Sequence, residues 1–262
     1  MTAVALTIAG SDPSGGAGLQ ADLKTFHQHG VYGMSVVTLL TVQNTQTVDA
    51  VRVLEPQFVT AQLDAVLRDI PPAAAKTGAL GSAAIIEAVA ERAASFSFPL
   101  VVDPVMISKH GAPLIDEDAA EVLRGRLLPR AYLVTPNQPE AAALAGFEID
   151  DLAAMERAAQ AIAQVGPANV LVKGGRLAEG ADDVLFAEGQ LHWFRGERIE
   201  TTSTHGTGCV FAAAITARLA KGDDLVSAVR GAKDFVTAAI RSAPALGHGL
   251  GPVNLHAAPP HA

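Results

Sequence analysis

The sequence predicts an α/β protein, a three-layer α/β/α sandwich in which helices cover both faces of a mostly parallel central sheet. Short runs of Val, Ile and Leu alternate with longer Ala-rich stretches along most of the 262 residues, a pattern typical of parallel sheets. Hydrophobic residues make up 49% of the chain but aromatic residues only 5%, so small aliphatic side chains must fill the core. No repeat or linker divides the chain, and we expect residues 1–262 to form one domain.

The first half of the chain alternates between predicted strands and predicted helices. Each predicted strand is a short apolar run, which is typical of a strand buried on both faces, and each predicted helix carries apolar residues at helical spacing. The strands are expected at residues 4–9, 35–42 and 74–77. The helices are expected at residues 18–29, 57–69 and 83–95.

The second half continues the alternation and then departs from it. Further strands are expected at residues 99–103, 131–135 and 169–173, with helices at 116–127, 140–145 and 152–165. Residues 183–188 and 190–194 are joined through Gly189, which predicts an antiparallel hairpin. Two helices, at residues 208–221 and 223–242, complete the predicted fold.

Charge and cysteine content exclude several classes of protein. A formal net charge of −8 and a pI near 5.4 argue against binding to nucleic acid or an anionic membrane, because both are negatively charged. The single cysteine cannot form an internal disulfide, which fits a reducing cytoplasm. Residues 4–9 lack a basic start and lead into a polar loop, so we expect a first strand there and no secretion signal. No apolar run approaches the roughly 18 residues that span a bilayer.

Polar residues follow most of the predicted strands. Ligands of open α/β sheets bind beyond the carboxyl ends of the strands, so these positions are candidates for a binding site. They are Asp12, Gln43, Asn44, Lys76, Asp103, Asn137, Glu140 and Lys173.

The glycine-rich segment Gly206, Thr207 and Gly208 precedes the apolar run of a predicted helix. Backbone amides and the positive end of the helix dipole should converge there, which predicts an anion site able to stabilise charge during phosphoryl transfer. A flexible loop before a packed helix is the alternative. Cys209 falls in the first turn, where we expect the dipole to lower the pKa of the thiol. It could accept a proton from a substrate hydroxyl, act as a nucleophile with His205, or be a small buried side chain.

A second glycine cluster contains Gly15, Gly16 and Gly18. Gly16, Gly18 and Ala21 match the dinucleotide-binding fingerprint, but residues 10–14 intervene after the strand and no acidic residue follows at the expected distance. An oxidoreductase is therefore disfavoured. We expect the loop to let backbone groups pack around a small polar substrate.

Asp103, Asn137 and Glu140 could together hold a hydrated magnesium ion through oxygen ligands, and Lys173 could place a cation near phosphates. Each residue also has a structural interpretation. Asp103 and Lys173 could simply end strands, and Asn137 with Glu140 resembles a helix cap. No Gly-Lys-Ser or Gly-Lys-Thr sequence is present, which excludes the common P-loop.

These segments, in this order, resemble the ribokinase-like superfamily and, within it, the bacterial hydroxymethylpyrimidine and phosphomethylpyrimidine kinases of thiamine biosynthesis. The resemblance covers almost the whole chain. It rests on the motifs at residues 7–18, 20–25, 76–78, 102–106, 135–137, 173–175, 204–209 and 247–249. Sugar kinases of the superfamily carry aspartate where Cys209 stands, so the cysteine indicates the pyrimidine branch.

The resemblance implies a role for each matching residue. Catalytic roles fall on Gly206, Thr207, Gly208 and Cys209. Contacts with the substrate fall on Gly10, Asp22, Gln43, Ala79 and Val105. Contacts with ATP and its phosphates fall on Asp103, Asn137, Glu140, Lys173 and Thr207, with Mg2+ held by Asp103 and Glu140 through water.

Two departures from the family pattern concern specificity. Many relatives carry methionine in place of Ala79 and a Lys-Asn pair in place of Thr202 and Ser203. The smaller side chain at position 79 could loosen discrimination between pyrimidine and pyridoxine-like substrates.

The resemblance implies a cytoplasmic kinase that uses ATP and Mg2+ to convert 4-amino-5-hydroxymethyl-2-methylpyrimidine to its monophosphate and then its diphosphate. The expected partners are this small pyrimidine, ATP and a second copy of the chain in a homodimer, with no nucleic acid and no membrane. A pyridoxine or pyridoxal kinase is the alternative within the superfamily. A thiol hydrolase using Cys209 and His205, and a nucleotide-binding protein without catalysis, are alternatives of other classes.

Overall fold

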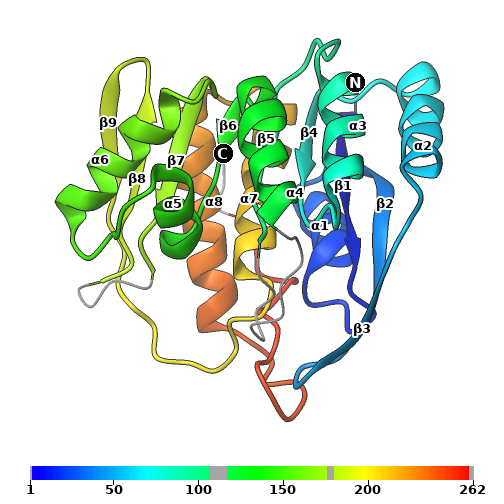
Figure 1. Ribbon diagram of the computed structural model, residues 1–262. Coiled ribbons are helices and arrows are strands. Elements are labelled where there is room, and N and C mark those ends of the chain that lie inside the picture. Colours follow the sequence, from blue (N-terminus) through cyan, green and yellow to red (C-terminus); the bar gives the residue numbers. More distant parts are fainter. Residues whose placement is uncertain (1, 107–116, 176–179, 260–262) are drawn as a thin grey trace.

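The computed structural model describes residues 2–106, 117–175 and 180–259, which form one mixed sheet between two layers of helices (Figure 1). Across this described part, the strands are ordered β3-β2-β1-β4-β5-β6-β7-β8-β9. Every neighbouring pair from β2 to β7 is parallel, whereas β3, β8 and β9 each pair with their predecessor in an antiparallel manner. The strands are β1 Val4–Ser11, β2 Tyr32–Gln43, β3 Val48–Val53, β4 Ala74–Thr77, β5 Leu100–Val102, β6 Leu133–Val134, β7 Asn169–Lys173, β8 Asp183–Ala187 and β9 Gln190–Phe194.

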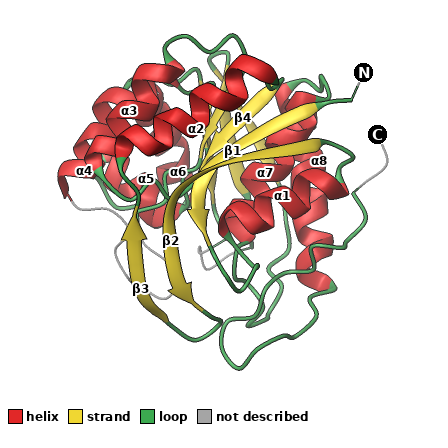
Figure 2. Cartoon of the chain, turned by 90° about the vertical axis from the view of Figure 1, so that its right-hand side faces the viewer, coloured by secondary structure: helices red, strands yellow, loops and turns green. Residues whose placement is uncertain are grey.

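Helices cover both faces of the sheet. One layer contains α2 to α6 and the other contains α1, α7 and α8, as Figure 2 shows with the sheet between them. The helices are α1 Gly18–Gln28, α2 Pro56–Asp69, α3 Ala83–Ala93, α4 Glu117–Val122, α5 Gln138–Ala145, α6 Leu152–Ala163, α7 Thr207–Ala220 and α8 Leu225–Arg241. The predicted fold class is confirmed.

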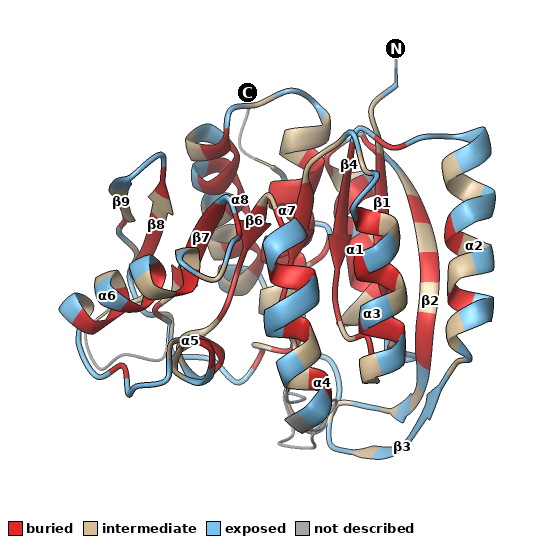
Figure 3. Cartoon of the chain, turned by 45° about the horizontal axis from the view of Figure 1, so that its top comes forward, coloured by how far each residue is buried: buried red, intermediate tan, exposed pale blue. Residues whose placement is uncertain are grey.

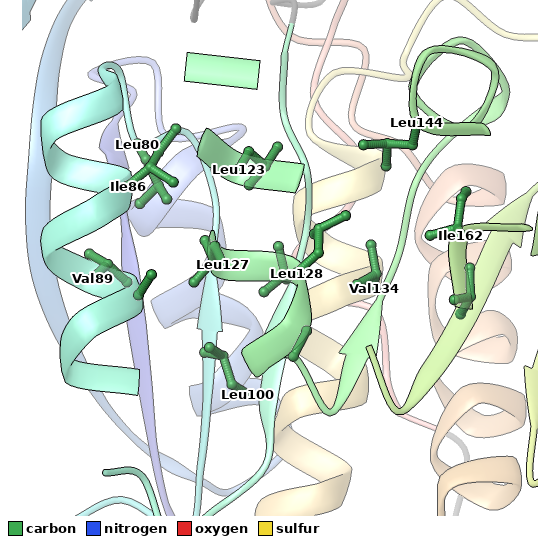
Figure 4. Packing of buried hydrophobic residues seen from close by; sticks show 14 of the residues in the cluster. Leu80, Ile86, Val89, Leu100, Leu123, Leu127, Leu128, Val134, Leu144 and Ile162 are labelled. Carbon is green, nitrogen blue, oxygen red and sulfur yellow. The ribbon is translucent and has the colours of Figure 1, made fainter. Parts of the chain in front are cut away.

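The strands of the sheet are buried on both sides because successive side chains point to opposite layers. Val102 and Val134 pack against the layer of α2 to α6, whereas Val101 and Leu133 pack against the layer of α7 and α8. Burial is concentrated in the strands and the inward helix faces (Figure 3). The close view of the first layer shows leucine, isoleucine and valine side chains meeting between α3, α6 and the sheet (Figure 4). Each fully buried aliphatic side chain contributes about 1.5–3 kcal/mol.

Most predicted elements are present, and three differ. Residues 48–53 form β3, which the sequence analysis did not predict, and β2 begins earlier than expected, at Tyr32. The helix predicted at 116–127 starts in the described residues at Glu117 and ends in a π-helical turn over Leu123–Leu127; position 116 lies outside the described residues. The predicted hairpin is confirmed, with Glu188 and Gly189 both at positive φ as a tight turn requires.

Among the described residues, no helix combines the length and the apolar character needed to cross a membrane.

His29 is a buried histidine just after α1, in the layer that also contains α7 and α8. Its Nδ1 lies 2.9 Å from the Thr25 carbonyl oxygen, and its ring meets the edge of Phe235 at 4.6 Å between centroids. Burial lowers the pKa of His29 below its ordinary value of 6.5, and the positive charges of Arg218 and Lys221 lower it further, against the hydrogen bond to Thr25. The neutral ring is therefore the form that fits the fold.

We predict that His29 makes the protein sensitive to mild acid. Because the pKa is lower in the folded chain than in the unfolded chain, its contribution to stability is complete above about pH 6.5 and is lost as the pH falls from that value through the lower pKa of the folded chain. Urea unfolding between about pH 7.5 and about pH 5 should show a smaller loss of free energy of unfolding in His29→Asn than in the wild type. His27→Asn, at an exposed histidine of the same helix, is the control and should behave as the wild type. Equal pH dependence in His29→Asn would contradict the prediction.

Candidate active site

A cavity of about 430 Å³ opens at the carboxyl ends of the parallel strands, where the first turn of α7 meets them. The residues that line it come from loops and strand ends distributed over the whole chain. It brings together Gly10, Gln43, Ala79, Asp103, Val105, Asn137, Glu140, Lys173, Gly206, Thr207, Gly208 and Cys209, all of which the sequence analysis assigned to the site. Asp22 is the exception, since it is fully buried and does not line the cavity. Its predicted contact with substrate stays a prediction.

The two glycine clusters contact each other through their backbones. Gly206 has φ 77°, and a Cβ atom there would overlap the carbonyl oxygen of Gly16. Gly18 has φ 56°, and a Cβ atom there would overlap the carbonyl oxygen of Gly10. Glycine is therefore required both for backbone conformation and for close approach. The cluster of Gly15, Gly16 and Gly18 thus packs against the segment of residues 206–208, and Gly18 also lines the cavity.

Asp12 connects the same two loops through hydrogen bonds. Its Oδ1 accepts from the backbone and the hydroxyl of Ser14, and its Oδ2 accepts from the backbone N–H of Ala17. His205 Nε2 lies 2.8 Å from the same Oδ2, and Gln43 Nε2 lies 3.3 Å from that nitrogen. Burial acts to raise the pKa of Asp12, but the hydrogen bonds from His205 and Ser14 outweigh it and hold the pKa below its usual value. The Asp12 carboxylate thus stays charged and keeps His205 in place.

The chemistry of Cys209 differs from the expectation. Burial raises the pKa of the thiol to about 12, and the negative charges of Asp22 and Asp103 add to this effect. Lys76 and a backbone hydrogen bond from Gly18 act in the opposite direction but do not compensate. The expected lowering of the pKa was therefore wrong, because loss of hydration outweighs the helix dipole. The thiol is protonated at neutral pH.

This result weakens the hydrolase alternative. A cysteine nucleophile needs a thiolate and a histidine positioned to take the proton. Here the thiol holds its proton, and His205 Nε2 lies next to Asp12 and Gln43.

Lys173 and Asp103 form an ion pair beside the glycine loop. Lys173 Nζ lies 3.1 Å from Asp103 Oδ1, to which the hydroxyl of Thr135 also donates. A Cβ atom at Gly208 would lie 3.3 Å from Lys173 Nζ and 3.8 Å from Asp103 Oδ2. Burial alone would lower the pKa of Lys173, but Asp103 and Glu140 raise it above its usual value. A lysine that stays positively charged thus lies next to the amides of the loop, where an anion would be bound.

Asn137 and Glu140 cap the amino end of α5. The Asn137 side chain accepts from the backbone N–H of Glu140 over 3.1 Å, and the Glu140 side chain accepts from the backbone N–H of Asn137 over 2.8 Å. The helix-cap interpretation is therefore confirmed. Both residues also line the cavity, so capping holds them in position there without excluding a second role.

Magnesium fits this site only through water. Within residues 2–106, 117–175 and 180–259, no group of three or more His, Cys, Asp and Glu side chains is arranged to hold a metal ion. Asp103 and Glu140 nevertheless line one cavity, and Mg2+ commonly binds one or two carboxylates while retaining several waters.

Two lysines, one behind the cavity lining and one on it, received no role from the sequence. Lys76 appeared among the polar residues at strand ends but received no role, although it forms a fully buried ion pair with Asp22 at 2.8 Å. The signal in the sequence was a lysine among the small residues of β4, Ala74, Ala75 and Thr77. On the far wall, Lys233 Nζ lies 2.6 Å from Asp183 Oδ2, and both residues line the cavity. No local pattern distinguishes Lys233, because it lies within an ordinary amphipathic helix.

Comparisons with known proteins agree with these features. A protein-family model described as phosphomethylpyrimidine kinase matches residues 12–254. The chain is 52% identical over 251 residues to the thiamine biosynthesis bifunctional protein ThiED of Geobacter sulfurreducens, covering 95% of this chain but spanning only 51% of that protein. It is 49% identical over 254 residues to the hydroxymethylpyrimidine/phosphomethylpyrimidine kinase of Synechococcus elongatus, covering 95% of this chain and 96% of that one.

The solved structures extend the comparison to a second kind of kinase. An ADP complex of Bacillus subtilis pyridoxal kinase superposes with a TM-score of 0.90 at 39% identity, and the match covers 98% of each chain.

We predict that Gly206→Ala lowers turnover more than the same substitution at another glycine with positive φ. The added methyl group would collide with the Gly16 carbonyl oxygen and move α7, and a displacement of about 1 Å can cost about 10²-fold in turnover. Gly146→Ala is the matched control, with φ 83° and no atom within 4 Å of the added Cβ. It should lose only about 1–2 kcal/mol from the left-handed conformation and retain its turnover. Kinase assays measure the turnover, and thermal denaturation measures the stability of each variant. Similar turnover in the two variants would contradict the prediction.

Proposed function

The chain belongs to the phosphomethylpyrimidine kinase family, and from this membership we propose that it transfers phosphate from ATP to 4-amino-5-hydroxymethyl-2-methylpyrimidine and then to the resulting monophosphate, in thiamine biosynthesis. One observation carries the proposal. Residues 206–208, the Lys173–Asp103 pair and Cys209 line one cavity, so groups suited to binding phosphate lie beside the thiol that we propose for the attacking hydroxyl.

The phosphate end of the site acts mainly through charge and position. The transition state of phosphoryl transfer is loose, so catalysis depends chiefly on aligning the reactants and stabilising charge on the phosphoryl oxygens. Gly206 to Gly208 supply backbone donors at the positive end of α7, and Lys173 supplies a charged donor. Cys209 accepts the hydroxyl proton late in the step, in the small fraction of molecules in which its thiol has first lost its own proton to solvent.

Magnesium is part of the proposal. Asp103 and Glu140 would hold Mg2+ through water, because one oxygen of each carboxylate already accepts hydrogen bonds, Asp103 Oδ1 from Lys173 and Thr135 and Glu140 Oε2 from the backbone N–H of Asn137. When bound, the ion would neutralise negative charge on the nucleotide phosphates.

The other end of the cavity suits a small aromatic ring. Gly10, Ala79 and Val105 provide a narrow, mostly apolar wall, and Gln43 provides an amide that can donate and accept hydrogen bonds at once. An aminopyrimidine edge requires both. The contacts of Gly10, Gln43, Ala79 and Val105 with the substrate are proposed on this basis.

Pyridoxal is the second candidate substrate. The small side chain of Ala79 leaves room beside the ring, and the structure of a pyridoxal kinase superposes closely on this chain.

We predict ADP release from ATP and Mg2+ in the presence of the hydroxymethylpyrimidine, and again in the presence of its monophosphate. Pyridoxal should support turnover at a lower kcat/KM. A coupled assay of ADP release with mass analysis of the products tests this prediction. ADP release with pyridoxal and with neither pyrimidine would show that pyridoxal is the substrate. No ADP release with any of the three compounds would refute the kinase proposal.

Cys209→Ala is the control variant for this assay. Loss of a proton acceptor should reduce turnover by about two to four powers of ten and leave ATP binding largely intact. In the wild type, formation of a covalent adduct between substrate and Cys209 in the absence of nucleotide would indicate the hydrolase alternative.

A homodimer and a cytoplasmic location complete the proposal. Leu40 and Val42 on β2 are 46% and 59% exposed, and Val51 and Val53 on the edge strand β3 are 41% and 39% exposed. Figure 2 shows β2 and β3 extending beyond the helical layers. Exposed apolar side chains on a sheet edge are typical of an interaction surface, here with a second copy of the chain. Cell fractionation tests the cytoplasmic location, where ATP and a reduced thiol are available.

We predict that Val42→Asp converts the dimer into a monomer, because an aspartate would have to lose its hydration in the contact. Size-exclusion chromatography with light scattering measures the mass. Tyr32→Asp is the control, since Tyr32 is 56% exposed at the opposite end of β2 and should leave the dimer intact. A monomeric wild type at micromolar concentration would rule out the homodimer.

A further inference from the structure

Lys76 is a fully buried lysine to which the reaction described above gives no role. It lies on β4, between β1 and β5 in the middle of the sheet, and its side chain is inaccessible to solvent. Removing an ammonium group from water costs several kcal/mol, and well-packed apolar side chains in place of a buried ion pair are often no less stable. Packing alone therefore does not account for a lysine at this position.

The partner of Lys76 is Asp22 on α1, which is equally inaccessible. Nζ of Lys76 lies 2.8 Å from Oδ2 of Asp22, and the Thr7 hydroxyl donates to the same oxygen over 2.6 Å. The other oxygen, Oδ1, is buried and accepts no hydrogen bond from the described part of the chain. Two donors thus hold the carboxylate at one oxygen and leave a second acceptor unused.

Lys76 also acts on the Cys209 thiol in the cavity. α7, which carries Cys209 in its first turn, packs against β4. Among the charges that affect the thiol, Lys76 is the strongest that favours loss of the proton, whereas Asp22 and Asp103 oppose it. The thiol therefore interacts with two lysines, Lys76 and the weaker Lys173, and with two carboxylates, and their balance affects how tightly its proton is held.

We propose that Lys76 is a positioning residue for the transfer reaction: its ammonium group holds Asp22 in place and supplies the positive charge beside the Cys209 thiol. Lys76 does not line the cavity and acts through these two residues. Without it, the Asp22 carboxylate would be left unpaired near the thiol and would hold the thiol proton more tightly. The effect on turnover rests on the proposed kinase function, but ionisation of the thiol can be measured without any substrate.

Two variants that change charge in opposite directions test the proposal by alkylation of Cys209 with iodoacetamide. Lys76→Met removes the cation, so alkylation at a fixed alkaline pH should slow by at least about threefold, the change expected for one unit in thiol pKa. Asp22→Asn removes the anion and leaves Lys76, so alkylation should accelerate by at least about threefold. Because the sequence contains a single cysteine, intact mass reports on this thiol alone.

Lys233→Met is the matched control. It breaks another largely buried lysine–aspartate pair, one that lines the cavity, with Lys233 Nζ 2.6 Å from Asp183 Oδ2, but Lys233 is not among the charges that act most on the thiol. Its alkylation rate should equal that of the wild type. Circular dichroism verifies that each variant is folded. Unchanged rates in both test variants, or changes of the same sign, would overturn the proposal. If Lys76→Met does not fold, Asp22→Asn decides alone, and an unchanged or slower rate contradicts the proposal.

Kinetics separate this inference from the proposed function. Lys76→Met should lower kcat by about tenfold or more and leave KM for ATP within about threefold of the wild type, since the nucleotide side is untouched. If the alkylation rates change as expected but the wild type has no kinase activity, the proposed function fails and the electrostatic role of Lys76 stands. A purely structural lysine would lower thermal stability without changing the alkylation rate, which would refute the inference.

Discussion

The backbone contact between residues 15–18 and residues 205–208 is the constraint on which the site depends. A side chain at Gly206 would collide with the carbonyl oxygen of Gly16, so the two segments can meet only because glycine is present. The hydrogen bond between Asp12, three residues before the first segment, and His205 in the second supports this contact across 193 positions of sequence. The contact fixes the first turn of α7 against the end of β1, and it thereby directs the amides of residues 206–208 into the cavity.

α7 holds that geometry because it is buried on all sides. Every residue from Val210 to Ala217 is buried, with the sheet on one side and α8 and α1 on the others. Its alanines allow close packing, and an all-round apolar helix of this kind belongs in a core. Rotation or sliding of α7 would open voids in the core, and each void costs stability. The donors at its amino end are therefore positioned before any ligand binds, the condition under which electrostatic stabilisation is most effective.

The features that sequence alone predicted are local, and those it did not predict depend on the assembled fold. The glycines at 206–208 and the apolar run after them lie within one short segment, as do most strands. β3 escaped prediction because its residues are largely exposed and form no apolar run. The ion pair between Lys76 and Asp22 joins positions 54 apart, and the sequence around neither residue indicates the pairing. The predicted direction of the Cys209 pKa shift was wrong for the same reason. Burial is a property of the packed structure, and here it outweighs the local helix dipole.

The distribution of charge explains why the site needs more than its lysines to bind a nucleotide. Lys76 is paired with Asp22 and Lys173 is paired with Asp103, so each cation beside the glycine loop is already neutralised. Phosphate groups would bring an excess of negative charge that these pairs cannot offset without breaking. The backbone N–H groups of Gly206 and Gly208 can offset part of it, whereas that of Thr207 already donates to the Thr204 carbonyl oxygen over 3.4 Å. A hydrated divalent cation at Asp103 and Glu140 suits the remainder, because both carboxylates line the cavity and attract positive charge into it. The same carboxylates that disfavour a phosphate alone would thus favour a phosphate accompanied by the proposed metal.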